Sequence, residues 1–255
     1  RPAGLASAVV DELTFPGRVA LVTGGSGGIG GALARRLARA GAAVAVSYHG
    51  HPDGAADVVS AIEGRGGHAV ALSADLRDPG AVDALVDAAQ AALGPVDMLV
   101  ANAGVARPAP LQQVDTDLFD ETLAVNLRAP FFLTRRVLPG MRHRRWGRIL
   151  YMTSVAGFTG GVVGPHYAAS KAALHGLTHY LATRAAADGV TVNALAPALI
   201  AGTRMLPGPA DEVARRIPVG RLGEPEEVAE LAHAMLANAY LTNQVVGLDG
   251  GMYPR

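Results

Sequence analysis

The sequence predicts an α/β protein in which one doubly wound, mostly parallel sheet is covered by helices on both faces. Short apolar runs alternate with helical patterns from Arg18 to the end of the chain, and this alternation is typical of parallel strands joined by helical crossovers. A glycine-rich run, Gly24–Gly30, directly follows the first apolar run. No internal repeat, linker or low-complexity tract divides the chain, so we expect a single domain.

The composition limits the classes of function. The chain has 255 residues, of which 50% are hydrophobic and 17% charged, and its formal net charge is zero. A balanced charge provides no general attraction for nucleic acid or an anionic membrane. The sequence contains no cysteine, which excludes disulfides and thiolate chemistry, and no apolar run reaches the ~18 residues of a membrane span. We expect a soluble cytoplasmic protein without a signal peptide, with a loose arm at 1–17 and the domain at 18–255.

The start of the domain has the order of a dinucleotide-binding unit. Arg18–Thr23 is predicted to be a strand and Gly24–Gly30 a turn. Leu33 and Leu37 then follow with helical spacing, and Gly41 closes the helix. In such a unit the glycines let the backbone approach a pyrophosphate that rests on the helix N-terminus. A glycine cluster alone would equally fit a flexible turn, but its place between a buried strand and an amphipathic helix favours cofactor binding.

The second strand bears on the choice of cofactor. The run Ala43–Ser47 is followed by Tyr48 and His49, and the first carboxylate after it is Asp53. An acid at the end of this strand would hold the ribose 2′-hydroxyl and repel a 2′-phosphate. Its absence favours NADP(H) over NAD(H).

The next strands bring polar and small residues to the same edge of the sheet. Their predicted elements are a helix at 53–63, a strand at 68–73, a helix at 81–93 and a strand at 96–100. Asp75 follows the first of these strands and Asn102–Gly104 the second, and ligands bind at the carboxyl ends of strands in open α/β sheets. We expect Asp75 either to accept a hydrogen bond from the adenine amino group or to cap the following helix.

The second half continues the alternation. Its predicted elements are a helical segment at 116–142, a strand at 148–153, a helix at 167–187, a strand at 190–194, a helix at 224–239 and a strand at 244–248. Asn126 is a polar residue on an otherwise apolar helical face, and a buried amide needs partners. It is therefore either a satisfied core amide or part of an active-site network. The Pro- and Gly-rich stretch 197–218 follows a strand at the ligand edge and is predicted to be a substrate lid.

The chemistry of the second half is concentrated between Ser154 and Lys171. Tyr167 and Lys171 are four residues apart, so both project from one face if Pro165 opens a helix. A phenol with an ordinary pKa near ~10 is a poor acid at neutral pH unless a fixed positive charge lowers that pKa. Lys171 would supply the charge. Ser154, after the apolar run 148–153, would offer a hydroxyl at the ligand edge.

This spacing alone is also typical of a half-buried tyrosine ring beside a solvated amine. The composition favours the chemical interpretation, because Lys171 is the only lysine among the 22 Lys and Arg residues. An arginine does not easily replace a compact ammonium that packs against a phenol and a ribose.

Three histidines lie in or next to the predicted helix 167–187. His175 and His179 are four apart on the same predicted helix, but no further ligand pattern accompanies them, so we expect a helix surface or interface and no metal site. His166, beside Tyr167, either tunes the site or has a structural role.

These motifs together resemble the short-chain dehydrogenase/reductase family, in its single-domain branch. They are Thr23-Gly-x-x-x-Gly28-Ile-Gly30, Asn102-Ala-Gly104, Asn126, Ser154 and Tyr167-x-x-x-Lys171, in this order. The likeness extends from Arg18 to Pro254 and includes Arg221-Leu-Gly-x-Pro-Glu-Glu-Val and Leu248-Asp-Gly-Gly251. The chain looks most similar to the 3-oxoacyl-(acyl carrier protein) reductases of fatty acid biosynthesis. The resemblance implies a Rossmann fold with a seven-stranded sheet.

The resemblance also implies roles for individual residues. Tyr167 would protonate the substrate carbonyl as hydride arrives from the nicotinamide, and Lys171 would lower the tyrosine pKa and hold the nicotinamide ribose. Ser154 would hydrogen-bond the carbonyl, and Asn126 would hold a water that reloads the proton through Lys171. The implied cofactor contacts are Thr23, Gly24, Ser26, Gly28, Ile29, Gly30, Ser47, Tyr48, Asp75, Leu76, Asn102, Ala103, Gly104, Tyr167, Lys171, Pro197, Ile200 and Thr203.

The implied function is NADPH-dependent reduction of a ketone, first among them a 3-oxoacyl thioester, with acyl carrier protein as a candidate partner. The family is commonly tetrameric through helices equivalent to 116–142 and 167–187, and the apolar run Phe131–Leu133 fits either such an interface or the core. Three alternatives stay open: an NAD(P)-dependent alcohol or sugar dehydrogenase, a polyketide-type ketoreductase, and a nucleotide-sensing regulator that has lost the chemistry.

The chain departs from the family pattern at several positions. Gly27 stands where many NADPH-dependent relatives carry an arginine, and Pro197–Ala198 stands where Pro-Gly is usual. Arg144 and Arg145 fit the basic surface on which a carrier protein would dock, but Asp188 stands where a second arginine is expected. These departures bear on the 2′-phosphate, the lid and the carrier protein.

Overall fold

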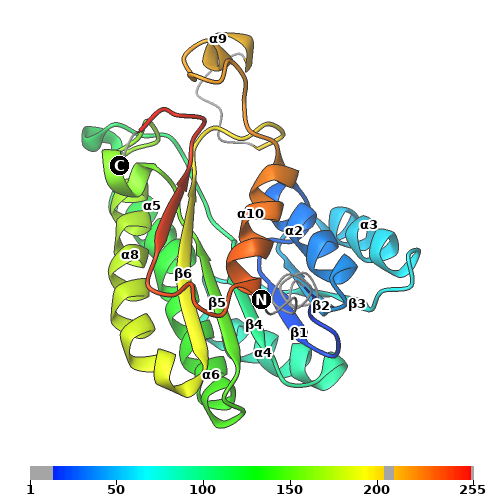
Figure 1. Cartoon of the computed structure of the whole chain (residues 1–255). Coiled ribbons are helices and arrows are strands. Elements are labelled where there is room, and N and C mark those ends of the chain that lie inside the picture. Colours follow the sequence, from blue (N-terminus) through cyan, green and yellow to red (C-terminus); the bar gives the residue numbers. More distant parts are fainter. Residues whose placement is uncertain (1–13, 204–209, 254–255) are drawn as a thin grey trace, which may run out of the picture.

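The computed structural model describes residues 14–203 and 210–253. Within these residues, seven strands form one sheet in the order β3-β2-β1-β4-β5-β6-β7, and every neighbouring pair is parallel (Figure 1). The strands are β1 (Val19–Val22), β2 (Ala43–Tyr48), β3 (Ala69–Ser73), β4 (Met98–Ala101), β5 (Gly147–Met152), β6 (Val190–Pro197) and β7 (Val245–Leu248). The predicted α/β class is confirmed, and the described sheet is wholly parallel.

Helices cover both faces of the sheet (Figure 1). They are α2 (Gly28–Arg39), α3 (Pro52–Glu63), α4 (Pro79–Leu93), α5 (Thr116–Leu123), α6 (Ala129–His143), α7 (Ala156–Thr159), α8 (Pro165–Ala185), α9 (Ala210–Ala214) and α10 (Pro225–Ala237), with the short segments η1 (Leu111–Gln113), η2 (Ala124–Arg128) and η3 (Ala186–Asp188). Side chains of a strand point alternately to the two faces. Accordingly, Ala20 and Val22 join the core under α2 and α10, and Leu21 joins the core under α4, α6 and α8.

The structure adds detail at two predicted boundaries. The segment 116–142 is helical throughout, as predicted, with the π-helical segment η2 between α5 and α6. The packed domain also begins before Arg18. Phe15 is 3% exposed, and its ring meets His233 of α10 edge-on at 5.6 Å between centroids. Of the expected arm at 1–17, residues 1–13 lie outside the described residues.

The carboxyl ends of β1 and β4 meet where the strand order reverses, and the first glycine turn is tied down there. Asn102 donates from its side-chain amide to the carbonyl oxygens of Thr23 (2.9 Å) and Gly24 (3.1 Å). A Cβ on Gly30 would lie 2.2 Å from the Gly24 oxygen and 2.5 Å from the Asn102 amide nitrogen. Only glycine therefore lets the start of α2 approach this turn.

The segment that follows β6 stands above this edge of the sheet, with α9 at its top (Figure 1). Val213, Ile217 and Leu222 form a small apolar cluster with Leu199 and Met252, apart from the two main cores. The predicted lid, 197–218, includes this segment, and its residues 204–209 lie outside the described residues. Among the helices of residues 14–203 and 210–253, none combines the length and hydropathy that a bilayer span requires.

Candidate active site

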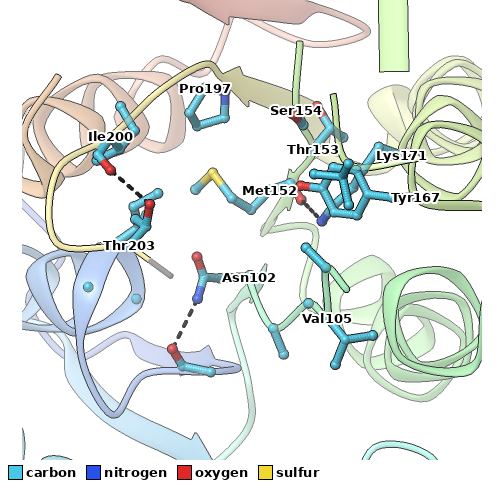
Figure 2. A pocket seen from close by; sticks show the side chains of 18 of the residues that line it. Asn102, Val105, Met152, Thr153, Ser154, Tyr167, Lys171, Pro197, Ile200 and Thr203 are labelled. Carbon is cyan, nitrogen blue, oxygen red and sulfur yellow. Dashed lines mark hydrogen bonds between the residues drawn. The ribbon is translucent and has the colours of Figure 1, made fainter. Parts of the chain in front are cut away.

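A cavity of about 960 Å³ runs along the carboxyl edge of the sheet, from the glycine turn to the start of α8. Figure 2 shows Ser154, Tyr167 and Lys171 on one side of it and Ile200 and Thr203 on the other. The cofactor residues implied by the sequence that line this cavity are Gly24, Ser26, Gly28, Ile29, Gly30, Ser47, Tyr48, Asp75, Leu76, Asn102, Ala103, Gly104, Tyr167, Lys171, Pro197, Ile200 and Thr203.

Thr23 does not line the cavity, in contrast to its implied role as a cofactor contact. Its side chain is buried, and its hydroxyl oxygen accepts hydrogen bonds from the backbone N–H groups of Asn102 and Ala103, both at 3.0 Å. These bonds join the ends of β1 and β4. Thr23 therefore shapes the cavity wall from behind.

The glycine turn fits the pyrophosphate of a dinucleotide. A Cβ on Gly27 or Gly28 would meet no atom within 4 Å, so this part of the turn borders open space. The helix that it opens, α2, has no acidic residue in its first turn and no side-chain cap on its first N–H groups. The positive end of the helix dipole thus faces the cavity without a competing anion of its own.

Asp75 lines the cavity, but its carboxylate is already engaged. The Arg77 guanidinium donates to both carboxylate oxygens, at 2.7 to 3.1 Å, and this hydrogen bonding lowers the pKa of Asp75 to about 2. The expected helix cap is instead Asp78, which accepts a hydrogen bond from Gly80 N at 2.9 Å. The capping alternative for Asp75 was therefore wrong, because the helix begins three residues later than that role requires.

The strand β2 ends at the part of the cavity where a 2′-phosphate would lie. Ser26, Ser47, Tyr48, His49 and His51 line it, and none of them carries a carboxylate. His51 was not predicted from the sequence as a cofactor residue. Its position directly before Pro52, which opens α3, was the signal that could have found it. Imidazoles and hydroxyls can donate hydrogen bonds to a phosphate.

Tyr167 is buried beside Ser154. The phenol is 4% exposed and is hydrogen-bonded to the Ser154 side chain. Burial raises the pKa of Tyr167 above its ordinary value, and the bond to Ser154 opposes this rise. The predicted neighbourhood of Ser154 and Tyr167 is therefore present, since the end of β5 and the first turn of α8 meet here.

Lys171 lies one turn further along α8 than Tyr167, as the spacing predicted. Its ammonium donates to the backbone oxygen of Met152 at 2.9 Å and lies 5.7 Å from the centre of the Tyr167 ring (Figure 2). Burial lowers the pKa of Lys171 to about 8. The amine is thus held by the end of β5 rather than by the phenol oxygen.

Asn126 is a satisfied core amide that does not itself line the cavity. It is fully buried in η2, where its amide oxygen accepts from Val105 N at 2.8 Å and its amide nitrogen donates to Val105 O and Ser170 Oγ, both at 3.0 Å. The Asn126 oxygen and the Lys171 nitrogen both lie 3.3 Å from where a Cβ on Gly104 would be. The satisfied amide therefore stands next to the catalytic lysine candidate, and a π-helical bulge at such a place is often functional.

His175 and His179, which the spacing paired on α8, have separate partners. His175 stacks against Phe158 with 4.3 Å between ring centres. His179 Nδ1 is hydrogen-bonded to Asn243 Oδ1 at 2.7 Å. In the part of the chain that the structure describes, no group of three or more His, Asp and Glu side chains is arranged to hold a metal.

The expected carrier-protein surface is largely used within the chain. Arg144 pairs with Asp97 at 3.2 Å and donates to Val96 O, and Asp188 pairs with Arg142 at 2.8 Å. Arg145 is exposed, but it lies before β5, at the end of that strand opposite to Ser154. These arginines therefore do not border the cavity.

The expected interface run splits between core and surface. Leu133 is fully buried, whereas 46% of Phe131 is exposed. On α8, 58% of Tyr180 is exposed. An aromatic surface thus exists on both helices that were expected to form subunit contacts.

Comparisons with known proteins agree with this site. Residues 18–212 match the profile of the family described as "short chain dehydrogenase". An acetoacetyl-CoA reductase of Rhizobium meliloti is 39% identical over 92% of this chain and 98% of the relative. A cis-4-hydroxycyclohexanecarboxylate dehydrogenase of Sinomonas cyclohexanicum is also 39% identical, over 93% of this chain and 97% of the relative.

A solved structure shows the same fold. The 3-oxoacyl (acyl-carrier-protein) reductase of Agrobacterium tumefaciens, crystallised with NADP bound, superposes with a TM-score of 0.90 at 36% identity, over 97% of this chain and 99% of that chain. With a family match over most of the chain and the motifs gathered around one cavity, the protein belongs to the short-chain dehydrogenase/reductase family and is an NAD(P)-dependent oxidoreductase similar to 3-oxoacyl-(acyl carrier protein) reductases.

Proposed function

We propose that the protein reduces the ketone of a 3-oxoacyl thioester with NADPH. The observation that carries the proposal is the single cavity in which Ser154 and the buried Tyr167–Lys171 pair face the same space as the glycine turn. This arrangement supports a proton donor and a hydroxyl donor at one end of the cavity and a helix suited to bind a pyrophosphate at the other. A nucleotide-sensing regulator would not need the buried phenol and amine.

In the proposed mechanism, the bound nicotinamide supplies the hydride. Tyr167 donates its phenol proton to the carbonyl oxygen, and the Ser154 hydroxyl donates a second hydrogen bond to the same oxygen. Lys171 then returns a proton toward Tyr167. With its pKa lowered to about 8 by burial, the ammonium is a better proton donor than an exposed lysine. We assign Asn126 to the water through which this proton is replaced, because its amide oxygen stands beside Lys171 across Gly104.

We further propose that NADPH is preferred over NADH. The end of β2 offers the hydroxyls and imidazoles of Ser26, Ser47, His49 and His51 to a 2′-phosphate, and it lacks the carboxylate that would repel one. Asp75, an acid that lines the same cavity, is paired with Arg77. The related reductase from Agrobacterium tumefaciens holds NADP, which agrees with this preference.

The proposed acyl substrate is supported by the relatives and by the wall of the cavity. The acetoacetyl-CoA reductase is named for a thioester, and Val105, Ala106, Val162, Val163 and Leu199 provide an apolar lining. The proposed substrates include thioesters bound to a carrier protein. We further propose that the protein is a homotetramer whose subunits meet through the aromatic surfaces of α6 and α8.

A second candidate is oxidation of a cyclic or secondary alcohol. The relative from Sinomonas cyclohexanicum, which is named as a dehydrogenase of a hydroxycyclohexanecarboxylate, favours it. The same Ser154, Tyr167 and Lys171 would serve in this direction, with the phenolate accepting the proton of the alcohol.

One set of assays decides between these functions. NADPH and NADH are each combined with acetoacetyl-CoA, the carrier-bound acetoacetyl thioester and simple diketones, and NADP and NAD with cyclic alcohols and polyols, while the absorbance of the reduced nicotinamide is followed. We expect the highest kcat/KM for acetoacetyl thioesters with NADPH. Turnover confined to alcohols would support the second candidate, and turnover that prefers NADH would contradict the cofactor proposal.

A further inference from the structure

The segment between β4 and η1 forms a wall of the cavity and is held in place by hydrogen bonds from residues outside the segment. Its residues Val105, Ala106 and Arg107 line the cavity. At its start, Val105 is held in both directions by the side chain of Asn126. At its end, Ala109 N donates to Val163 O, in the loop before α8, at 2.9 Å.

His166 provides a third fastening, in the middle of this wall. It is the second residue of α8 and directly precedes Tyr167. Only 1% of its surface is exposed, and its Nε2 lies 3.1 Å from the backbone oxygen of Arg107. A carbonyl oxygen can only accept, so the imidazole must carry a hydrogen on Nε2 and donate it. This bond links the cavity wall to the residue next to the proposed acid.

The other side of the ring is closely packed and makes no second polar bond. Nδ1 is buried without a hydrogen-bond partner in the described structure. A Cβ on Gly164, where φ is +148°, would lie 2.8 Å from the ring carbon Cε1, 3.0 Å from Nδ1 and 2.4 Å from the backbone oxygen of Ala109. The ring therefore occupies space that only a glycine leaves open. Burial of an imidazole with one unused nitrogen is costly, and space filling alone would be served better by an apolar side chain.

We propose that His166 is a positioning residue for substrate. Its Nε2–H bond to Arg107 O fixes the wall Val105–Arg107 at a set distance from Tyr167. The carbonyl group of the substrate, held between this wall and the phenol, is thereby aligned for proton transfer. This inference rests on the proposed function of Tyr167, and it assigns to His166 no contact with the reacting atoms.

Three substitutions distinguish the role of the Nε2–H donor from that of the volume of the imidazole ring. In His166→Gln the amide nitrogen lies at the position of Nε2 along the side chain and can still donate to Arg107 O. In His166→Asn the amide nitrogen lies at the position of Nδ1 and cannot reach that oxygen. His166→Phe keeps a ring but has no donor. Asn and Phe remove the donor to the Arg107 carbonyl, which Gln keeps.

The kinetic test measures kcat, KM for acetoacetyl-CoA and the Kd for NADPH by nucleotide fluorescence. We expect His166→Asn and His166→Phe to lose about tenfold in kcat/KM, mostly through kcat, with the NADPH Kd unchanged, because the substrate carbonyl is less well aligned once the hydrogen bond to the wall is lost. His166→Gln should stay within about threefold of wild type. Wild-type kinetics in Asn and Phe would overturn the proposal, and so would an equal loss in Gln and Asn.

A second readout does not depend on turnover. Amide hydrogen exchange of residues 105–109 should be faster in His166→Asn than in wild type and unchanged in His166→Gln, since the fastening is lost only in the former. If wild type reduces no acyl thioester but exchange follows this pattern, the proposed substrate is wrong and the fastening stands. Identical exchange in wild type and all three variants would refute the fastening itself.

Discussion

At the scale of single residues, the buried amine of Lys171 is the most unusual group in the site. It is 3% exposed, its hydrogen-bond acceptor is a neutral carbonyl, and burial lowers its pKa from 10.5 to about 8. The sequence indicated the pairing of Lys171 with Tyr167 through their spacing. It did not indicate that the amine donates to Met152, because that contact depends on how α8 packs against the end of β5, which the spacing along the helix does not reveal.

Lys171 should make the stability of the protein depend on pH. Below about pH 8 both the folded and the unfolded chain carry the charge, and the folded state bears the cost of burying it. Between about 8 and 10.5 the folded chain releases the proton first, so its stability rises with pH. The full change is on the order of 3 kcal/mol. Urea unfolding of wild type and Lys171→Met across this window should show the rise only in wild type, and parallel pH profiles would contradict it.

Gly27 allows a residue-scale test of cofactor choice. A Cβ added there meets no atom within 4 Å, so Gly27→Arg should fold and place a guanidinium at the turn. We expect the Kd for NADPH to fall about tenfold relative to that for NADH, as one charge-assisted contact to a phosphate would give. Fluorescence titration with both nucleotides measures the ratio. An unchanged ratio would show that the 2′-phosphate is bound elsewhere.

At the scale of elements, the sequence located the strands and helices well and their ends less well. The alternation of apolar runs and helical patterns was sufficient for the strands that carry the site. The sequence did not indicate the π-helical form of η2 within the predicted helical segment, because α- and π-helical segments share nearly the same apolar spacing over five residues. The capping alternative for Asp75 failed because α4 begins at Pro79, so its N-cap is Asp78.

The cap of α4 can be tested directly. Asp78→Ala removes the acceptor for Gly80 N and should lower the free energy of unfolding by about 1 kcal/mol. Asp83→Ala, at an exposed position of the same helix, is the matched control and should change stability little. Chemical denaturation of both variants is the measurement. An equal effect of the two substitutions would mean that Asp78 does not act as a cap.

At the scale of the whole molecule, the parallel sheet gathers the site. Strands β1, β2, β4, β5 and β6 all end at the cavity. This common edge followed from the sequence, because parallel crossovers bring carboxyl ends together. The packing of the basic residues did not follow from the sequence. Arg144 pairs with Asp97, and Asp188 with Arg142, through contacts that no local pattern reveals.

The same geometry bears on docking of a carrier protein. Arg145 and the cavity lie at opposite ends of β5, which six residues at ~3.3 Å each place about 20 Å apart. We therefore expect Arg145→Glu to change KM for carrier-bound and CoA-bound acetoacetate by the same small factor. Steady-state kinetics with both substrates provide the comparison. A rise in KM for the carrier-bound substrate alone would establish the basic turn as a docking surface.

The most direct test of the account is the kinetics of Tyr167→Phe together with its affinity for NADPH. The substitution removes the phenol hydroxyl and keeps the buried ring. If Tyr167 protonates the substrate carbonyl, kcat should fall by about 10³-fold while the NADPH Kd stays within about threefold of wild type. Turnover near the wild-type rate, with NADPH bound as tightly as before, would contradict the proposed chemistry.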